Sequence, residues 1–140
     1  MSERIRVGVV GTGWWATQFH LDALMRNPHV EVAALADSAP PRLQKAAQHF
    51  GIEATFTEPG ELFASGLVDA VIIATPHATH YALVKAALEH DLHALCEKPF
   101  VLESQQGYEL LRIARERSLH RPRCAAPMDR LDQAYPDRSR

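Results

Sequence analysis

A short valine-rich run that ends in two glycines constrains the fold of this chain more than any other feature. The run from Ile5 to Val10 has the composition of a strand buried on both faces. Gly11 and Gly13 end it, and helix-forming residues follow from Trp14 to Arg26. A strand, a glycine turn and a helix in this order predict the start of a parallel α/β sheet.

Strand and helix patterns alternate over most of the chain. The further expected strands are residues 30–36, 54–57, 68–75 and 92–96. The further expected helices are one that enters at Pro40 and ends before Gly51, and residues 59–65, 79–90 and 104–116, with Ser38 and Ser104 as N-caps. This alternation predicts right-handed crossovers and a doubly wound parallel sheet of the Rossmann type with about five strands.

The character of the sequence changes after Leu119. Residues 120–140 contain three prolines, five arginines and few large apolar side chains, and no strand pattern remains. A complete doubly wound sheet with two equal halves needs a sixth strand here. We therefore expect one domain at residues 1–119, an irregular tail at 120–140, and a sixth strand that is missing or degraded.

The glycine turn has the spacing G-x-G-x-x-G/A, with Ala16 at the last position. Gly11 permits the tight turn, Gly13 lets a pyrophosphate approach the backbone, and the helix start offers N–H groups and a partial positive charge. The alternative is an ordinary glycine turn. The dinucleotide reading predicts NAD or NADP as cofactor. The turn residues expected at it are Gly11, Thr12, Gly13, Trp14 and Trp15.

Asp37 follows the second expected strand, 24 residues after Gly13. At this place a carboxylate can accept both hydroxyls of the adenosine ribose and repels a 2′-phosphate, which favours NAD over NADP. Ser38 and Arg42 lie just beyond and can soften that preference. The alternative is a turn residue that only ends the strand.

Two further turns follow the fourth and fifth expected strands and should face one crevice, because the carboxyl ends of parallel strands share an edge. His77 and His80 are three apart, but zinc needs more ligands than these and no further ligand motif accompanies them, so we expect no metal. Hydrogen bonding to the cofactor or helix capping fits them better. The residues expected at the cofactor from these turns are Thr75, Pro76, His77, His80, Glu97 and Lys98.

Lys98 is the candidate catalytic residue. A lysine that is partly desolvated beside a positively charged nicotinamide ring has a lowered proton affinity and can relay a proton to or from a substrate hydroxyl. Glu97 can orient it, and Pro99 fixes the turn and is a candidate for a cis peptide bond. The alternative is an exposed Glu–Lys pair before a turn.

The motifs Gly11-Thr12-Gly13, Ala74-Thr75-Pro76 with His80, and Glu97-Lys98-Pro99 fall in order on the expected elements. Together with the stretch from His80 to Leu88, they resemble the Gfo/Idh/MocA family over residues 4–118. The resemblance implies an N-terminal domain that binds NAD or NADP, a catalytic role for Lys98, and cofactor contact for Thr75 and His80. It also implies substrates among sugars, polyols and their derivatives.

Members of that family carry a second α/β domain that supplies the substrate pocket, an acid/base histidine and much of the oligomer interface. The chain has no counterpart of it, which predicts a truncated or frame-shifted gene product or an isolated cofactor-binding half. Three functions stay open. They are the N-terminal half of an oxidoreductase that moves hydride between a nicotinamide cofactor and a sugar or polyol-type secondary alcohol, a non-catalytic dinucleotide-binding module, and an inactive fragment that self-associates through an exposed fifth-strand edge.

Composition excludes some partners. The formal net charge of −2 shows no basic excess for a nucleic-acid surface. No run reaches the roughly 18 apolar residues of a membrane span, and the first residues do not have the pattern of a signal peptide. Two cysteines are too few for a disulfide framework and suit a reducing cytoplasm, where we expect the protein.

Overall fold

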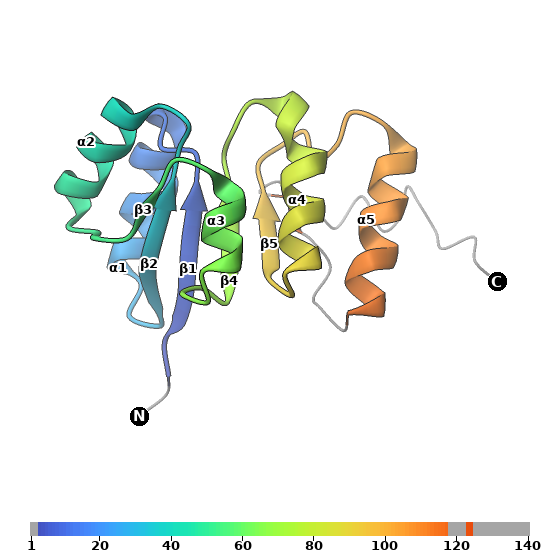
Figure 1. Cartoon of the computed structure of the whole chain (residues 1–140), viewed down its shortest axis with the longest axis horizontal. Helices are drawn as coiled ribbons and strands as arrows, with labels where there is room; N and C mark the ends of the chain where they lie inside the picture. Colours follow the sequence, from blue (N-terminus) through green and yellow to red (C-terminus); the bar gives the residue numbers. More distant parts are fainter. Residues whose placement is uncertain (1–2, 118–122, 125–140) are drawn as a thin grey trace.

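The computed structural model describes residues 3–117 and 123–124, which form a six-stranded parallel sheet between two layers of helices (Figure 1). The strands are β1 (Ile5–Val10), β2 (Val30–Ala36), β3 (Thr55–Phe56), β4 (Ala70–Ile73), β5 (His93–Cys96) and β6 (Arg123–Cys124). Their order across the sheet is β3-β2-β1-β4-β5-β6, and each neighbouring pair is parallel. This is the strand order of a dinucleotide-binding fold, so the predicted fold class is confirmed.

Helices connect the strands on both faces. The first helix runs from Trp14 to Arg26, with a π-helical segment η1 (Ala16–Leu21) ahead of α1 (Asp22–Arg26). The others are α2 (Pro40–Phe50), α3 (Pro59–Ala64), the 3₁₀ turn η2 (His77–Thr79), α4 (His80–Glu89) and α5 (Ser104–Glu116). In Figure 1, α1 and α2 lie behind the sheet, while α3, α4 and α5 cover the face toward the viewer.

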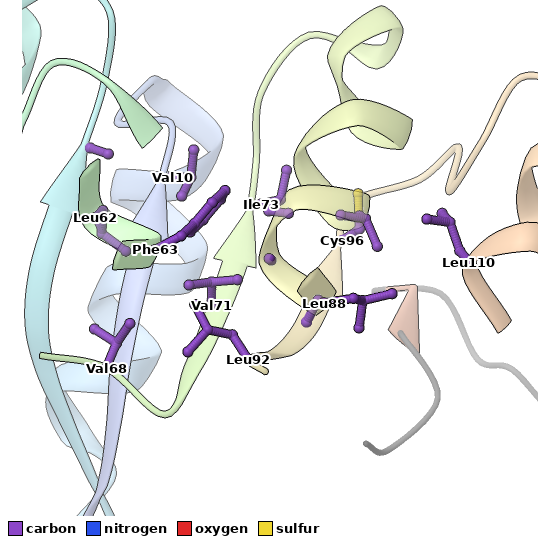
Figure 2. Close-up of a cluster of buried hydrophobic side chains, with 14 of the residues drawn as sticks. Val10, Leu62, Phe63, Val68, Val71, Ile73, Leu88, Leu92, Cys96 and Leu110 are labelled. Carbon is purple, nitrogen blue, oxygen red and sulfur yellow. The ribbon is translucent and has the colours of Figure 1, made fainter. Parts of the chain in front are cut away.

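The core has two layers because successive residues of a strand point to opposite faces. In β1, Val7 and Val9 pack with Ala16 and Leu21 of the first helix. Val10 belongs to the other layer, under α3, α4 and α5. Figure 2 shows side chains of that second layer gathered between the sheet and its helices. Both faces of β1 are therefore buried, and its carboxyl end is held firmly where the glycine turn begins.

The predicted boundaries of β2 are confirmed, and α2 and α5 begin at Pro40 and Ser104 as expected, but the predicted caps of both helices are wrong. The N-cap of α2 is Ala39 and that of α5 is Glu103, and neither makes a side-chain cap bond. The expected caps, Ser38 and Ser104, do not occupy the N-cap position. At α2 the reason is local, since a cap at Ser38 would need an N–H from Pro40 or Pro41, and proline has none. The N–H of Ala39 goes to the carboxylate of Asp37 at 2.8 Å.

The tail contains a strand where the pattern predicted none. Arg123–Cys124 forms β6, which pairs in parallel with Leu95 and Cys96 of β5. The sixth strand is therefore short rather than missing, and it covers the part of the β5 edge that we expected to be open for self-association. The predicted domain boundary at residue 119 and the rest of the predicted tail lie outside the described residues.

Candidate functional site

The glycine turn after β1 is built on a backbone that only glycine fits. Gly11 has a φ of +94°, and a Cβ placed on it would lie 2.3 Å from the carbonyl oxygen of Ala74. Its N–H donates to the carbonyl of Ala36 at 2.8 Å. The turn is thereby tied to the ends of β2 and β4, as the tight-turn role of the first glycine requires.

Gly13 has the opposite surroundings. A Cβ added to it would meet no protein atom within 4 Å, so the space beside this residue is open. The helix begins at Trp14, and Thr17 donates its N–H to the carbonyl of Gly13 at 3.0 Å. The amides ahead of Thr17 belong to the first turn, where N–H groups have no intrahelical acceptor. An open space beside the free amides of a helix start is what an anion-binding turn requires.

The π-helical segment η1 connects this turn to the end of β5. Trp15 donates its indole N–H to Oε1 of Glu97 at 2.7 Å, and His20 donates Nε2–H to the same oxygen at 2.5 Å. Burial raises the pKa of Glu97, but the hydrogen bonds from Trp15 and His20 outweigh it and hold the pKa below its ordinary value. The carboxylate thus stays ionised between the two elements.

Asp37 lies at the end of β2, beside the turn, and its side chain is almost fully buried. Oδ2 accepts the N–H and the hydroxyl of Thr12, both at 2.8 Å, and Nε of Arg42 at 2.9 Å. Oδ1 accepts the N–H of Ala39 and Nη2 of Arg42, each at 2.8 Å. Burial raises the pKa of Asp37, but these bonds prevail and lower it to about 2. Both oxygens that were expected to receive ribose hydroxyls already have donors within the chain.

The turn after β4 is cross-linked by side chains. The hydroxyls of Thr75 and Thr79 lie 2.7 Å apart. His80 is fully buried, with Nδ1 2.7 Å from the carbonyl of Pro99 and Nε2 2.9 Å from the carbonyl of Thr75. Carbonyl oxygens only accept, and the tautomer of the ring decides which nitrogen donates to its carbonyl. His80 therefore ties the two turns together with its polar atoms, where direct cofactor contact was expected, while His77 is exposed.

Lys98 lies in the turn after β5, and the peptide bond to Pro99 is cis, as the sequence led us to expect. Its N–H donates to Oε2 of Glu97 at 3.3 Å. Glu97 thus contacts the main chain of Lys98, where we expected it to orient the lysine. The side chain of Lys98 is exposed. The partial desolvation that we expected of it beside a nicotinamide ring stays a prediction.

Most of the predicted site residues meet along one edge of the sheet. Contacts run from the glycine turn to Asp37 on one side, and through Glu97 and the turn of Thr75 on the other. Ser38 is exposed at the end of this row. Sequence reasoning missed His20. It is five residues from Trp15, a spacing that does not share a face of an α-helix, and the only signal is a histidine on the helix that follows the glycine turn.

One hollow of the described surface, of about 390 Å³, adjoins the glycine turn, and its lining includes Thr12, Gly13, Trp14 and Arg42. A larger one, of about 530 Å³, lies at the opposite edge of the sheet beside the ion pair of Arg6 and Asp69, away from the predicted chemistry. Within residues 3–117 and 123–124, no group of three or more potential ligands is placed to hold a metal ion. In the same part of the chain, no helix is long and apolar enough to cross a membrane.

The strand order and this edge define a class of protein: a Rossmann domain built to bind a dinucleotide. The model of a family described as "Oxidoreductase family, NAD-binding Rossmann fold" matches residues 5–120. The chain belongs to this family, the Gfo/Idh/MocA oxidoreductases, and the resemblance inferred from its motifs is confirmed.

Known relatives agree with this assignment. An inositol 2-dehydrogenase from Rubrobacter xylanophilus is 40% identical over 98 residues, 70% of this chain and 28% of that protein. The crystal structure of GenD2 from gentamicin A biosynthesis in complex with NAD matches with a TM-score of 0.82 and 30% identity, over 89% of this chain and 35% of GenD2. KijD10, a 3-ketoreductase from Actinomadura kijaniata solved with NADP and TDP-benzene, matches with a TM-score of 0.80 and 33% identity, over 84% of this chain and 36% of that one. The chain spans about a third of the length of the curated relatives it matches.

Proposed function

We propose that this chain holds NAD or NADP along the carboxyl ends of its strands and serves as the dinucleotide-binding half of a sugar or polyol oxidoreductase. The observation that carries the proposal is the contrast between the two glycines of the turn. Gly11 is closed in by backbone, whereas Gly13 borders open space at the start of a helix. The amides there suit a diphosphate, and Thr12, Trp14 and Trp15 flank it.

The end of the site near β4 and β5 suits the nicotinamide half of the cofactor. When bound, a nicotinamide dinucleotide supplies a hydride donor or acceptor to such a site. Thr75 and Pro76 would line this part, with His77 at its exposed rim. Lys98 would hold or move a proton at a substrate hydroxyl. The names of the relatives, an inositol dehydrogenase and a 3-ketoreductase, support a polyol or sugar as substrate.

We further propose that NAD is preferred over NADP. Asp37 is buried and ionised beside the turn, which disfavours a 2′-phosphate. The side chain of Arg42 is 54% exposed, so it can leave the carboxylate and free its oxygens for the ribose hydroxyls. Ser38 and the released Arg42 are the groups that would contact the 2′-phosphate if NADP binds instead.

The proposal is tested by titrating the full chain with NADH and NADPH while exciting Trp14 and Trp15 and recording energy transfer to the cofactor. The test variant is Gly13→Ala, because the new Cβ enters the open space without touching the protein. We expect saturable binding that Gly13→Ala weakens about tenfold, a loss of about 1.4 kcal/mol. Gly60→Ala is the matched control, since its Cβ also meets nothing within 4 Å. The proposal is contradicted if folded protein binds neither cofactor at millimolar concentration. It is also contradicted if Gly13→Ala binds the cofactors as tightly as the wild-type chain does.

A non-catalytic dinucleotide-binding module is the second candidate, and the exposure of Lys98 favours it. The two functions differ in turnover. Loss of NADH absorbance in the presence of keto-inositols or 3-keto sugars supports the oxidoreductase half, provided that Lys98→Ala abolishes this loss. Binding of NADH without any turnover across these substrates supports the module.

A further inference from the structure

We propose that His20 is a positioning residue for Lys98, acting through Glu97, and that the π-helical segment η1 brings it into place. The inference rests on the proposed function, because it gives Lys98 its task. No sequence motif drew attention to His20. Its place follows from three contacts that converge on one carboxylate.

The winding of the helix brings two donors to one oxygen of Glu97. Trp15 and His20 are five residues apart and donate to the same oxygen of Glu97, at 2.7 Å and 2.5 Å. In an α-helix, residues five apart point in directions about 140° apart. A π-helix pairs residues i and i+5, and η1 covers the interval between these two. The centroid of the Phe19 ring lies 4.3 Å from the centroid of the Trp15 ring, so the two rings pack against each other.

The carboxylate of Glu97 is largely buried. The side chains of His20 and Glu97 are each 15% exposed. A carboxylate so enclosed needs its hydrogen bonds, since an unpaired one would bear the full cost of desolvation. Trp15 and His20 share Oε1, which leaves Oε2 to face the main chain of Lys98.

Glu97 in turn holds the main chain of Lys98. The N–H of Glu97 continues the ladder of β5 by donating to the carbonyl of Ile73 at 2.9 Å, and the N–H of Lys98 donates to Oε2 of Glu97 at 3.3 Å. The main chain is thus held on both sides of the Cα atom of Glu97. Without the donor from His20, Glu97 can turn about its own side-chain bonds and release the N–H of Lys98.

The test uses the full chain labelled with ¹⁵N and follows two protons that share Glu97 as acceptor. These are the indole N–H of Trp15, distinguished from that of Trp14 with a Trp14→Phe variant, and the amide N–H of Lys98. We expect His20→Ala to shift the indole signal and to speed hydrogen exchange of the Lys98 amide about tenfold, as loss of a bond to a charged group implies. His20→Gln keeps an N–H donor and should restore both signals. His29→Ala, an exposed histidine at the other end of the sheet, should change neither.

A second readout separates positioning of Lys98 from general loosening. The chain has three lysines, so acylation of Lys98 can be compared by mass spectrometry with Lys45 and Lys85 in the same sample. A positioning role predicts that His20→Ala changes the rate at Lys98 about tenfold relative to Lys45 and Lys85, the effect of one lost bond to a charge. Equal changes at all three lysines overturn it. If His20→Ala does not fold, Trp15→Phe removes the other donor to Oε1 and should act in the same direction.

The outcomes for the two proposals are distinct because neither readout needs a cofactor. Failure of the wild-type chain to bind NADH defeats the proposed function, whatever His20 does. Normal NADH binding with an unchanged Trp15 indole and Lys98 amide in His20→Ala overturns the inference alone. An effect of His29→Ala as large as that of His20→Ala overturns it as well.

Discussion

Arg42 lies across the carboxylate of Asp37, with Nε 2.9 Å from Oδ2 and Nη2 2.8 Å from Oδ1. The pair is asymmetric, because Asp37 is buried while Arg42 remains half in solvent. A fork of this kind is a strong contact, yet one of its partners is free to leave. A ribose that binds at Asp37 therefore competes with Arg42 for the same two oxygens.

This competition predicts opposite effects on the two cofactors. Arg42→Ala frees the carboxylate for the ribose hydroxyls and removes a cation from the 2′-phosphate. We expect NADH to bind as tightly as before or more tightly and NADPH to bind several-fold more weakly, by roughly the 0.5–1 kcal/mol of an exposed ion pair. The fluorescence titration measures both. Equal losses for NADH and NADPH would mean that Arg42 does not face the ribose.

The complementary substitution is Asp37→Ala, which removes the acceptor that distinguishes the cofactors. We expect it to weaken NADH more than NADPH, because only the unphosphorylated ribose can donate two hydroxyls to the carboxylate. The same titration gives both dissociation constants. An equal change for both cofactors would place Asp37 away from the ribose.

Asp37 also makes the stability of the chain depend on pH. Its pKa falls from 3.8 to about 2 in the folded state, so its stabilising effect is complete above pH 3.8 and disappears as the pH falls through 2. We expect the wild-type chain to lose about 2 kcal/mol of its stability advantage over Asp37→Asn between pH 5 and pH 2. Urea unfolding of both proteins at each pH measures the difference. An advantage that does not change with pH would contradict the assignment.

Gly11 should tolerate no side chain. Gly11→Ala places a Cβ 2.3 Å from the carbonyl oxygen of Ala74, on a backbone with positive φ. We expect a loss of about 3 kcal/mol in the free energy of unfolding. Gly51→Ala is the matched control. It also has positive φ but open space around the new Cβ, and it should cost about 1 kcal/mol. Equal costs at the two glycines would remove the steric argument.

His80 should stabilise the fold by joining two turns. His80→Leu removes both contacts of a fully buried ring to the carbonyls of Thr75 and Pro99, and we expect a loss of about 3 kcal/mol. His77→Leu, on an exposed neighbour, should cost little. A cost at His80 no larger than that at His77 would mean that the ring does not join the two turns.

Long apolar runs and glycine spacing were sufficient to predict the sheet and the turn. The strand at Val30–Ala36 and the turn at Gly11 follow from local sequence, because burial on both faces and positive φ each restrict the residue types. Residues 123–124 lie between Pro122 and Pro127 with no run of large apolar side chains around them, so β6 was beyond the pattern. The expected cap at Ser38 is wrong because the two residues that would donate to it, Pro40 and Pro41, have no N–H.

The candidate site was predicted in its parts but not in its connections. The positions of Asp37, Glu97 and Lys98 at strand ends follow from the topology of parallel sheets. Their partners depend on side chains that arrive from other elements, such as Arg42 from α2 and His20 from η1. Trp15 and His20 are five residues apart, and residues at this spacing do not share a face of an α-helix. The link from His20 to Glu97 therefore required the three-dimensional structure.

A π turn amounts to an α-helix that carries one surplus residue. Deleting a single amino acid between Trp15 and His20 would let the segment relax to ordinary winding and would leave the two residues four apart, a spacing that shares one face of an α-helix. The indole and the imidazole would still converge on Glu97. Inserting one amino acid would instead leave them six apart, and in ordinary winding they would point about 120° away from each other. The length of this stretch, and not only its composition, is thus under constraint, because an insertion here would act at a distance on the turn that holds Lys98.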